Sequence, residues 1–157
     1  MANAIFNIAL GRVNELHDRV VSNDPTNSAL IIVLLKVAEV DATLKDYDTL
    51  ALLLAGANTE ANFTNYARKT LTNTELSAST VNDATDVRYA DMPDQTWTAA
   101  GGTTDNTLVK LLVCYDSDTT AGTDANIIPL AHFDFTLTTD GSDILAQVHA
   151  SGYYVAS

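Results

Sequence analysis

Cysteine and basic residues are scarce in this chain. Cys114 is the only cysteine, so no disulfide can form within the chain and the fold must rely on packing. The chain has 8 Lys and Arg residues against 20 Asp and Glu residues, a formal net charge of −12, and Arg68-Lys69 is the only adjacent basic pair. Nucleic acids and anionic lipid surfaces repel an acidic protein without a basic patch. We therefore expect neither a nucleic-acid partner nor a membrane partner.

Long hydrophobic runs are also missing. The longest, ALIIVLLKV from Ala29 to Val37, is interrupted by Lys36, whereas a membrane helix needs about 20 apolar residues. Its β-branched residues and its lack of alternation predict a central strand that is apolar on both faces.

Signatures of catalysis are lacking as well. The sequence contains no G-x-S-x-G elbow, no phosphate-binding loop and no dinucleotide fingerprint. His17, His132 and His149 lie on separate segments without metal-ligand spacing, and Cys114 lies in an apolar run where an inert buried thiol is expected. We expect no catalytic residue, no cofactor, no metal and no enzymatic activity, while a hydrolase with unrecognised residues remains a third alternative.

The residues that are abundant predict β-structure. The hydrophobic share is 46% in 157 residues, enough for a single domain with a real core. From Asn65 onward, short β-like segments alternate with turns such as NDATD, GGTTDN and TTDGSD, which is typical of a sandwich or barrel. The predicted fold is mainly β, a jelly-roll-like β-sandwich with one or two short helices. It forms one domain over residues 1–157 with an N-terminal arm over about residues 1–7.

Local signals place individual elements. DYDTLALLLAG predicts a helix over residues 46–55, capped by Asp46 or Asp48 and closed by Gly56. Residues 13–21 either form a hairpin with residues 29–37 or form a helix. The Asp-Gly pair in TLTTDGSDILAQV predicts a hairpin between the two runs that flank it.

Three carboxylates, Asp116, Asp118 and Asp124, lie in the loop of LVCYDSDTTAGTDANIIPLAHFDF. An EF-hand loop that starts at Asp116 would need Gly at the sixth position and Glu at the twelfth, where this chain has Ala121 and Ile127. We expect a solvated hairpin tip, and weak binding of an ion remains the alternative.

Aromatic residues offer two interpretations. Trp97 in QTWTAA and the pair Tyr153-Tyr154 in SGYYVAS would suit a sugar-binding platform if they were exposed together. The simpler interpretation, which we favour, places Trp97 in the core or an interface and turns one tyrosine outward on the last strand.

Four stretches resemble a group of small tailed-bacteriophage virion proteins: the opening MANAIFN, QTWT, the hairpin LVKLLVCYDSDTTAGTDANIIPLAHFDF, and the closing DGSDILAQVHASGYYVAS. The resemblance covers much of the chain, is strongest from about Asp91 to the end, and is weak between Val13 and Ala61. It implies a virion component that resembles head decoration or cement proteins, with tail, collar or fibre roles also open. No catalytic signature belongs to this pattern, so no site residues carry over.

The expected function is therefore that of a non-enzymatic structural protein of a phage particle, made in the host cytoplasm. Its expected partners are the major capsid protein or other virion proteins, and it is expected to form a homo-oligomer. The alternative is a carbohydrate- or receptor-binding module of a tail, collar or head fibre. Ile5 and Phe6 in the arm would be poorly placed on an isolated chain, so we expect them to become ordered against another subunit.

Overall fold

The computed structural model describes residues 4–157 and is mainly β, with three short α-helices. Its elements, in chain order, are β1 (Ala4–Ile5), the 3-10 turn η1 (Asn7–Ala9), α1 (Val13–Val21), β2 (Ala29–Val37), α2 (Asp41–Leu44), α3 (Leu50–Ala55), β3 (Thr59–Glu60), β4 (Lys69–Leu71), β5 (Thr80–Asn82), β6 (Val87–Ala90), β7 (Gln95–Trp97), β8 (Thr107–Asp116), η2 (Asp124–Asn126), β9 (Ile128–Thr138), β10 (Ile144–Ala146) and β11 (Tyr154–Ala156).

The largest sheet is built around β2, β8 and β9. Its strand order is β1-β9-β8-β2-β3, with β4 also pairing with β2, and every pairing is antiparallel. The prediction of a central strand over residues 29–37 is confirmed, with both faces of β2 buried. Leu30, Ile32 and Leu34 belong to one core and Ile31, Val33 and Leu35 to the other, as the period of two in a strand requires.

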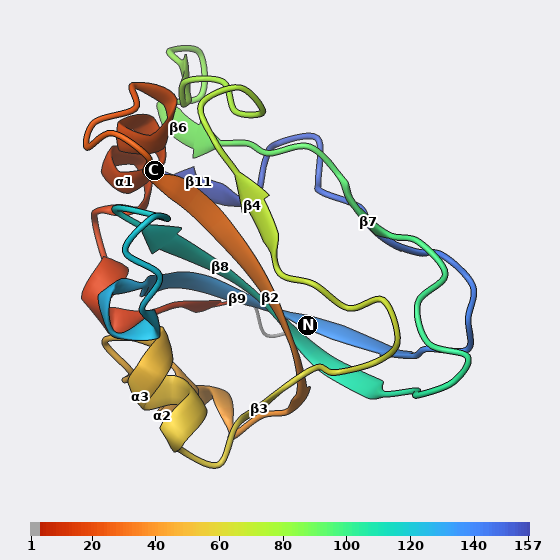
Figure 1. Ribbon diagram of the computed structural model, residues 1–157. Helices are drawn as coiled ribbons and strands as arrows, with labels where there is room; N and C mark the ends of the chain where they lie inside the picture. The colour runs from red at the N-terminus through yellow and green to blue at the C-terminus, as the bar shows by residue number, and fades with distance from the viewer. Residues whose placement is uncertain (1–3) are drawn as a thin grey trace.

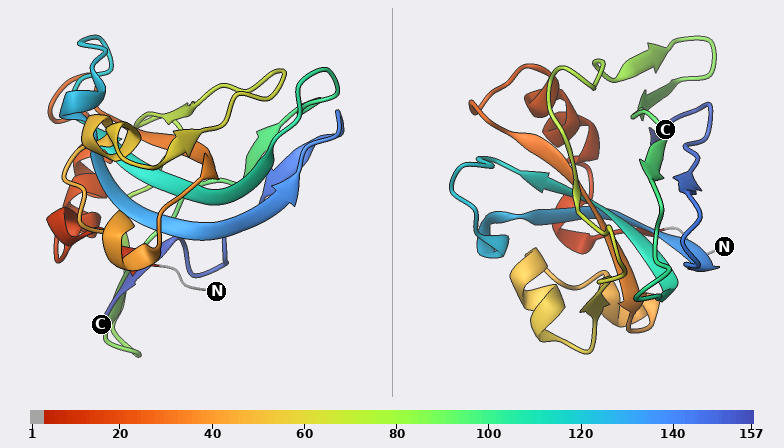
Figure 2. Two further views of the ribbon diagram at one scale, coloured as in Figure 1. Left: turned by 90° about the horizontal axis from the view of Figure 1, so that it is seen from below. Right: turned by 45° about the vertical axis from the view of Figure 1, so that its right-hand side comes forward.

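Different elements cover the two faces of this sheet. On one side, Leu44 of α2 and Leu50 and Leu53 of α3 pack against β2 and β8. On the other side lie α1, the pair β10-β7 and the three-stranded sheet β11-β6-β5. Figures 1 and 2 show the gold helices α2 and α3 apart from the green and blue strands β7 and β10. The chain is thus mainly β, with several antiparallel sheets.

Residues 13–21 form the helix α1, not a strand of a hairpin. Val13, Leu16, His17 and Val20 are its buried residues, the i, i+3, i+4, i+7 spacing of one helix face. This periodicity decides between the two interpretations that the sequence left open.

The helix predicted over residues 46–55 is shorter than expected. It begins at Leu50, because the side chain of Thr49 caps it by accepting a hydrogen bond of 3.2 Å from the Leu52 N–H. Asp46 is engaged elsewhere, since its carboxylate accepts a hydrogen bond of 2.5 Å from Asn7. The short helix α2 just before it was not predicted.

The hairpin predicted at Asp140-Gly141 is wrong. β10 pairs with β7 instead of β9, with Ile144 opposite Trp97. The Gly141 N–H donates to the Ala100 carbonyl and the Ala100 N–H donates to Ser142. The turn therefore bonds to the loop after β7 and carries the chain out of the main sheet.

Within residues 4–157, no helix has the length and apolar character that crossing a membrane requires.

Candidate functional site

The loop with the three carboxylates connects β8 and β9, which pair as the predicted antiparallel hairpin. Asp116 accepts a hydrogen bond of 3.0 Å from the Asp118 N–H, and Asp118 in turn accepts from the N–H and the hydroxyl of Thr120. The hydroxyl bond of Thr120 contributes most to lowering the pKa of Asp118. These two carboxylates hold the turn together, which is the role expected of Asp at a hairpin tip.

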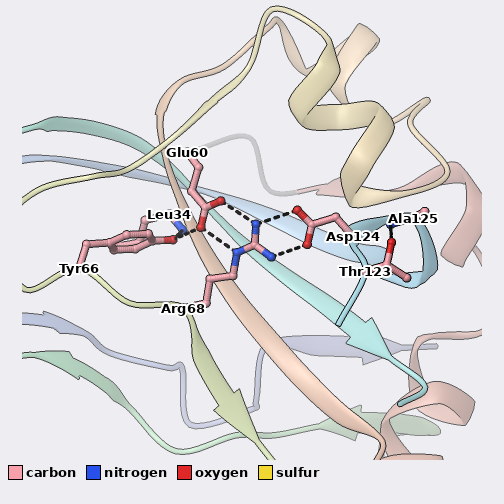
Figure 3. A network of polar contacts seen from close by, with 7 residues as sticks. All are labelled: Leu34, Glu60, Tyr66, Arg68, Thr123, Asp124 and Ala125. Atoms are coloured by element: carbon pink, nitrogen blue, oxygen red, sulfur yellow. Dashed lines mark hydrogen bonds and ion pairs between the residues drawn. The ribbon is translucent and has the colours of Figure 1, made fainter. Parts of the chain in front are cut away.

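The third carboxylate of the loop, Asp124, binds Arg68 (Figure 3). Two of the Arg68 nitrogens bond both oxygens of Asp124, at 2.6 and 3.0 Å. Two bond both oxygens of Glu60, at 2.8 and 2.7 Å. Hydrogen bonding to Arg68 lowers the pKa of Asp124. Such bidentate pairs are among the stronger polar contacts in proteins.

Tyr66 extends this network into the main sheet. Its hydroxyl donates to Glu60 at 2.8 Å and accepts from the Leu34 N–H at 3.1 Å. Burial is the main reason why the pKa of Tyr66 is raised. We call Glu60, Tyr66, Arg68 and Asp124 the arginine clamp. It connects the tip of the β8–β9 hairpin to the edge of β2 with which β3 and β4 pair.

The carboxylates of the loop therefore do not converge on one point. Among the residues that the structure describes, no cluster of three or more His, Cys, Asp or Glu side chains could hold a metal ion. Because Asp124 already satisfies both oxygens with Arg68, the geometry gives no support to weak ion binding, and the expected absence of a metal stays a prediction.

A second charged group lies on the face of the sheet that α2 covers. Lys110 is buried in β8 and forms ion pairs with Asp41, at 2.6 Å, and with Asp134. Burial alone would lower the pKa of Lys110, but its hydrogen bonds to Asp134 and Asp41 outweigh that effect and the pKa is raised. This group was not predicted from the sequence, although a lysine within the apolar run LVKLLV indicates a buried charge that needs a partner.

His132 lies beside this group with 0% of its surface exposed. Its Nδ1 is 3.9 Å from a carboxylate oxygen of Asp41, and neither ring nitrogen has a hydrogen-bond partner within residues 4–157. Burial, and next the charge of Lys110, lower the pKa of His132. The His132 ring therefore fills this position as a buried packing group.

The other two histidines and the cysteine are not part of the charged group around Lys110. His17 is buried between the Ser77 carbonyl, at 2.8 Å, and the Tyr153 hydroxyl, at 3.2 Å. His149 lies on an exposed turn, where it accepts from the Ser151 N–H. Cys114 is buried as expected, and burial raises the pKa of its thiol.

Trp97 is a core residue, as the simpler interpretation held. Only 1% of its surface is exposed, and its indole N–H donates to the Ala67 carbonyl at 2.9 Å. Tyr153 is also buried and Tyr154 is half-buried. Trp97 therefore cannot serve as part of an exposed sugar-binding platform.

Ile5 and Phe6 pack on their own chain. Ile5 pairs with Ala131 of β9, the Phe6 N–H donates to Leu130, and the Phe6 side chain has 0% exposure. The expectation that both residues would be poorly placed on an isolated chain is therefore wrong, because β1 pairs with β9 and the Phe6 side chain belongs to the core that α2 and α3 cover. Residues 1–3 of the predicted arm lie outside the described residues, and a role of the arm in assembly stays a prediction.

An apolar groove of about 430 Å3 lies on the face of the sheet opposite α2 and α3. Its main apolar lining comes from segments far apart in the sequence: Met92, Leu111, Phe133, Phe135, Val148 and Tyr153. This volume is within the range of roughly 300–1,000 Å3 typical of ligand sites. We call this feature the apolar groove.

A larger depression of about 530 Å3 lies along α1, but it is wide open. Four of its charged side chains already pair with one another, Arg88 with Asp18 and Arg19 with Glu15. The apolar groove is thus the better candidate for binding.

No protein-family model matches the chain, and no curated protein or solved structure matches it.

Proposed function

We propose that this protein is a non-enzymatic structural component of a tailed-phage particle that decorates or cements the capsid through protein–protein contacts. The observation that carries the proposal is the apolar groove, an accessible concave surface on a strongly acidic protein. Concave apolar surfaces with a few polar groups at their borders are where proteins bind ligands and partners.

The position of the groove in the sequence supports this proposal. Every residue that lines it lies between Met92 and Tyr153. This is the part of the chain, from Asp91 onward, where the resemblance to small phage virion proteins is strongest. The jelly-roll-like sandwich is the finer fold that we propose with it, and the burial of both faces of β2 supports it.

The polar groups of the chain are consistent with a structural role. Within the arginine clamp, Arg68 pairs with two carboxylates, and Lys110 likewise pairs with two carboxylates of its own group. These ion pairs hold the hairpin and the sheet in place. We include a homo-oligomer in the proposal, which light scattering of the purified protein tests directly.

Mass spectrometry of gradient-purified particles from the phage that encodes the chain tests the proposed function. We expect the protein to be present in a fixed ratio to the major capsid protein and to be cross-linked to it by short amine-reactive reagents. Particles from a deletion of the gene should break at a lower temperature. If purified wild-type particles lack the protein, the proposal is wrong.

A further inference from the structure

The floor of the apolar groove is formed by side chains of the main sheet. Phe133 and Phe135 project from β9 on the same face, because strand residues two apart point the same way. Leu111 of β8, which is opposite Phe133 in the register, continues this surface. A large apolar group that bound here would be shielded from water by three apolar side chains.

The far wall of the groove, residues 146–153, is bonded to the segment between β6 and β7. The Asp94 carboxylate accepts a hydrogen bond of 2.7 Å from the Val148 N–H, and the Tyr153 N–H donates to the Ala90 carbonyl at 3.0 Å. Gly152 has φ +77°, and a Cβ there would lie 2.1 Å from the Ala90 oxygen, so only glycine fits. A groove formed in advance binds at a lower cost in conformational entropy.

Two exposed aspartates, Asp91 and Asp94, lie next to residues that line the groove. Asp94 bonds the wall residue Val148, and Asp91 precedes the lining residue Met92 and packs its backbone against Gly152. Both aspartates are exposed. None of the described residues that line the groove is Lys or Arg. A positively charged neighbour would therefore be attracted to these two aspartates.

We propose that the apolar groove binds a phenylalanine or leucine side chain of a partner protein, on a segment that carries Lys or Arg beside it. This inference rests on the proposed function and names the chemistry of the partner. A second copy of the chain fits less well, because each copy has a net charge of −12. Its one adjacent basic pair, Arg68-Lys69, has Arg68 engaged in the arginine clamp.

Two synthetic peptides that differ only in their two charged residues test the proposal, with the full-length chain as the binding protein. One is acetyl-Lys-Thr-Phe-Leu-Thr-Lys-amide, and its twin has Glu in place of both Lys. Titration followed by two-dimensional NMR should show saturable binding of the basic peptide, with shifts at Val148 and Phe133. The acidic twin should bind about tenfold more weakly at low salt, and the difference should shrink at high salt.

Matched variants locate the binding. Val148→Trp fills the groove and should abolish binding of the basic peptide. Leu145→Trp makes the same change at an exposed position of β10 outside the groove and should leave binding intact. The pair Asp91→Asn and Asp94→Asn keeps the side-chain acceptors but removes the charges, and it should remove the preference for the basic peptide.

Equal affinity for the two peptides, or unchanged binding to Val148→Trp, would overturn the proposal. So would tighter binding of p-cresol, a neutral aromatic molecule, than of the basic peptide, because the groove would then be a small-ligand site. If neither peptide binds but phage particles contain the chain, this inference fails and the proposed function stands. If the basic peptide binds but the particles lack the chain, the proposed function fails.

Discussion

Replacing Phe6 by Ala should destabilise the folded chain strongly. The side chain is fully buried beside the core under α2 and α3, and its ring packs edge-on against His132 with centroids 5.4 Å apart. Moving a phenylalanine side chain from water into a core contributes about 1.5–3 kcal/mol. The cavity left behind adds to this loss, so the free energy of unfolding should fall by about 3–5 kcal/mol.

Urea and thermal unfolding followed by circular dichroism measure this effect. For a domain of this size the melting temperature should fall by roughly 6–20 °C. Leu10→Ala is the control, since Leu10 is 62% exposed and its replacement should change stability by less than about 0.5 kcal/mol. If Phe6→Ala were as stable as this control, Phe6 would not be a core residue of the isolated chain.

The same reasoning applies to a deletion of residues 2–7. An arm ordered only on a neighbouring subunit could be removed without loss of fold. Because Phe6 belongs to the core of its own chain, we expect the deletion to lower the melting temperature as well.

Four further predictions concern the charged groups and the thiol. Arg68→Met removes the cation that pairs with Glu60 and Asp124 and should cost about 1–3 kcal/mol of stability in urea, whereas Arg12→Met, at an exposed ion pair, should not. Since the folded pKa of His132 lies below its ordinary value of 6.5, the unfolded chain binds the proton more readily, so stability should fall as the pH drops below about 6.5. His132→Leu should flatten that slope between pH 7.5 and 5, and an unchanged slope would rule out His132 as its source. A chelator should leave the melting temperature unchanged. If the loop did bind an ion present at 100 times its dissociation constant, removing that ion would lower the free energy of unfolding by about 2.7 kcal/mol. Cys114 should react slowly with a thiol reagent in the native state and quickly in denaturant, and equal rates would show that it is accessible.

Elements with a strong local signal were the ones that could be predicted. The first seven residues of β2, Ala29–Leu35, are apolar and buried on both faces, which only a central strand or a buried helix can satisfy. The Asp-Gly turn was found, but its partner strand was not. A turn fixes only the local direction of the chain. The pairing of β10 with β7 instead of β9 goes with hydrogen bonds between the turn residues Gly141 and Ser142 and the distant Ala100.

The candidate sites depend on contacts between segments that are distant in the sequence, so local sequence patterns do not predict them. Arg68 and Asp124 meet only because the β8–β9 hairpin folds back beside β4. Met92, Phe133 and Val148 have no shared spacing in the sequence, yet they line one groove. The burial of Phe6 likewise depends on its pairing with β9, near the other end of the chain.

The pairing of β2 with β8 has a consequence for synthesis. Val37 ends β2 and Thr107 begins β8, so 107 − 37 = 70 positions separate them. At roughly 5–20 residues per second, the ribosome needs several seconds to make that stretch. During this time the most apolar segment of the chain has left the ribosome without its central partner. Pairing across such a separation also folds slowly. Residues 29–37 are therefore the segment from which aggregates should start during rapid overexpression, and slower translation should raise the soluble yield.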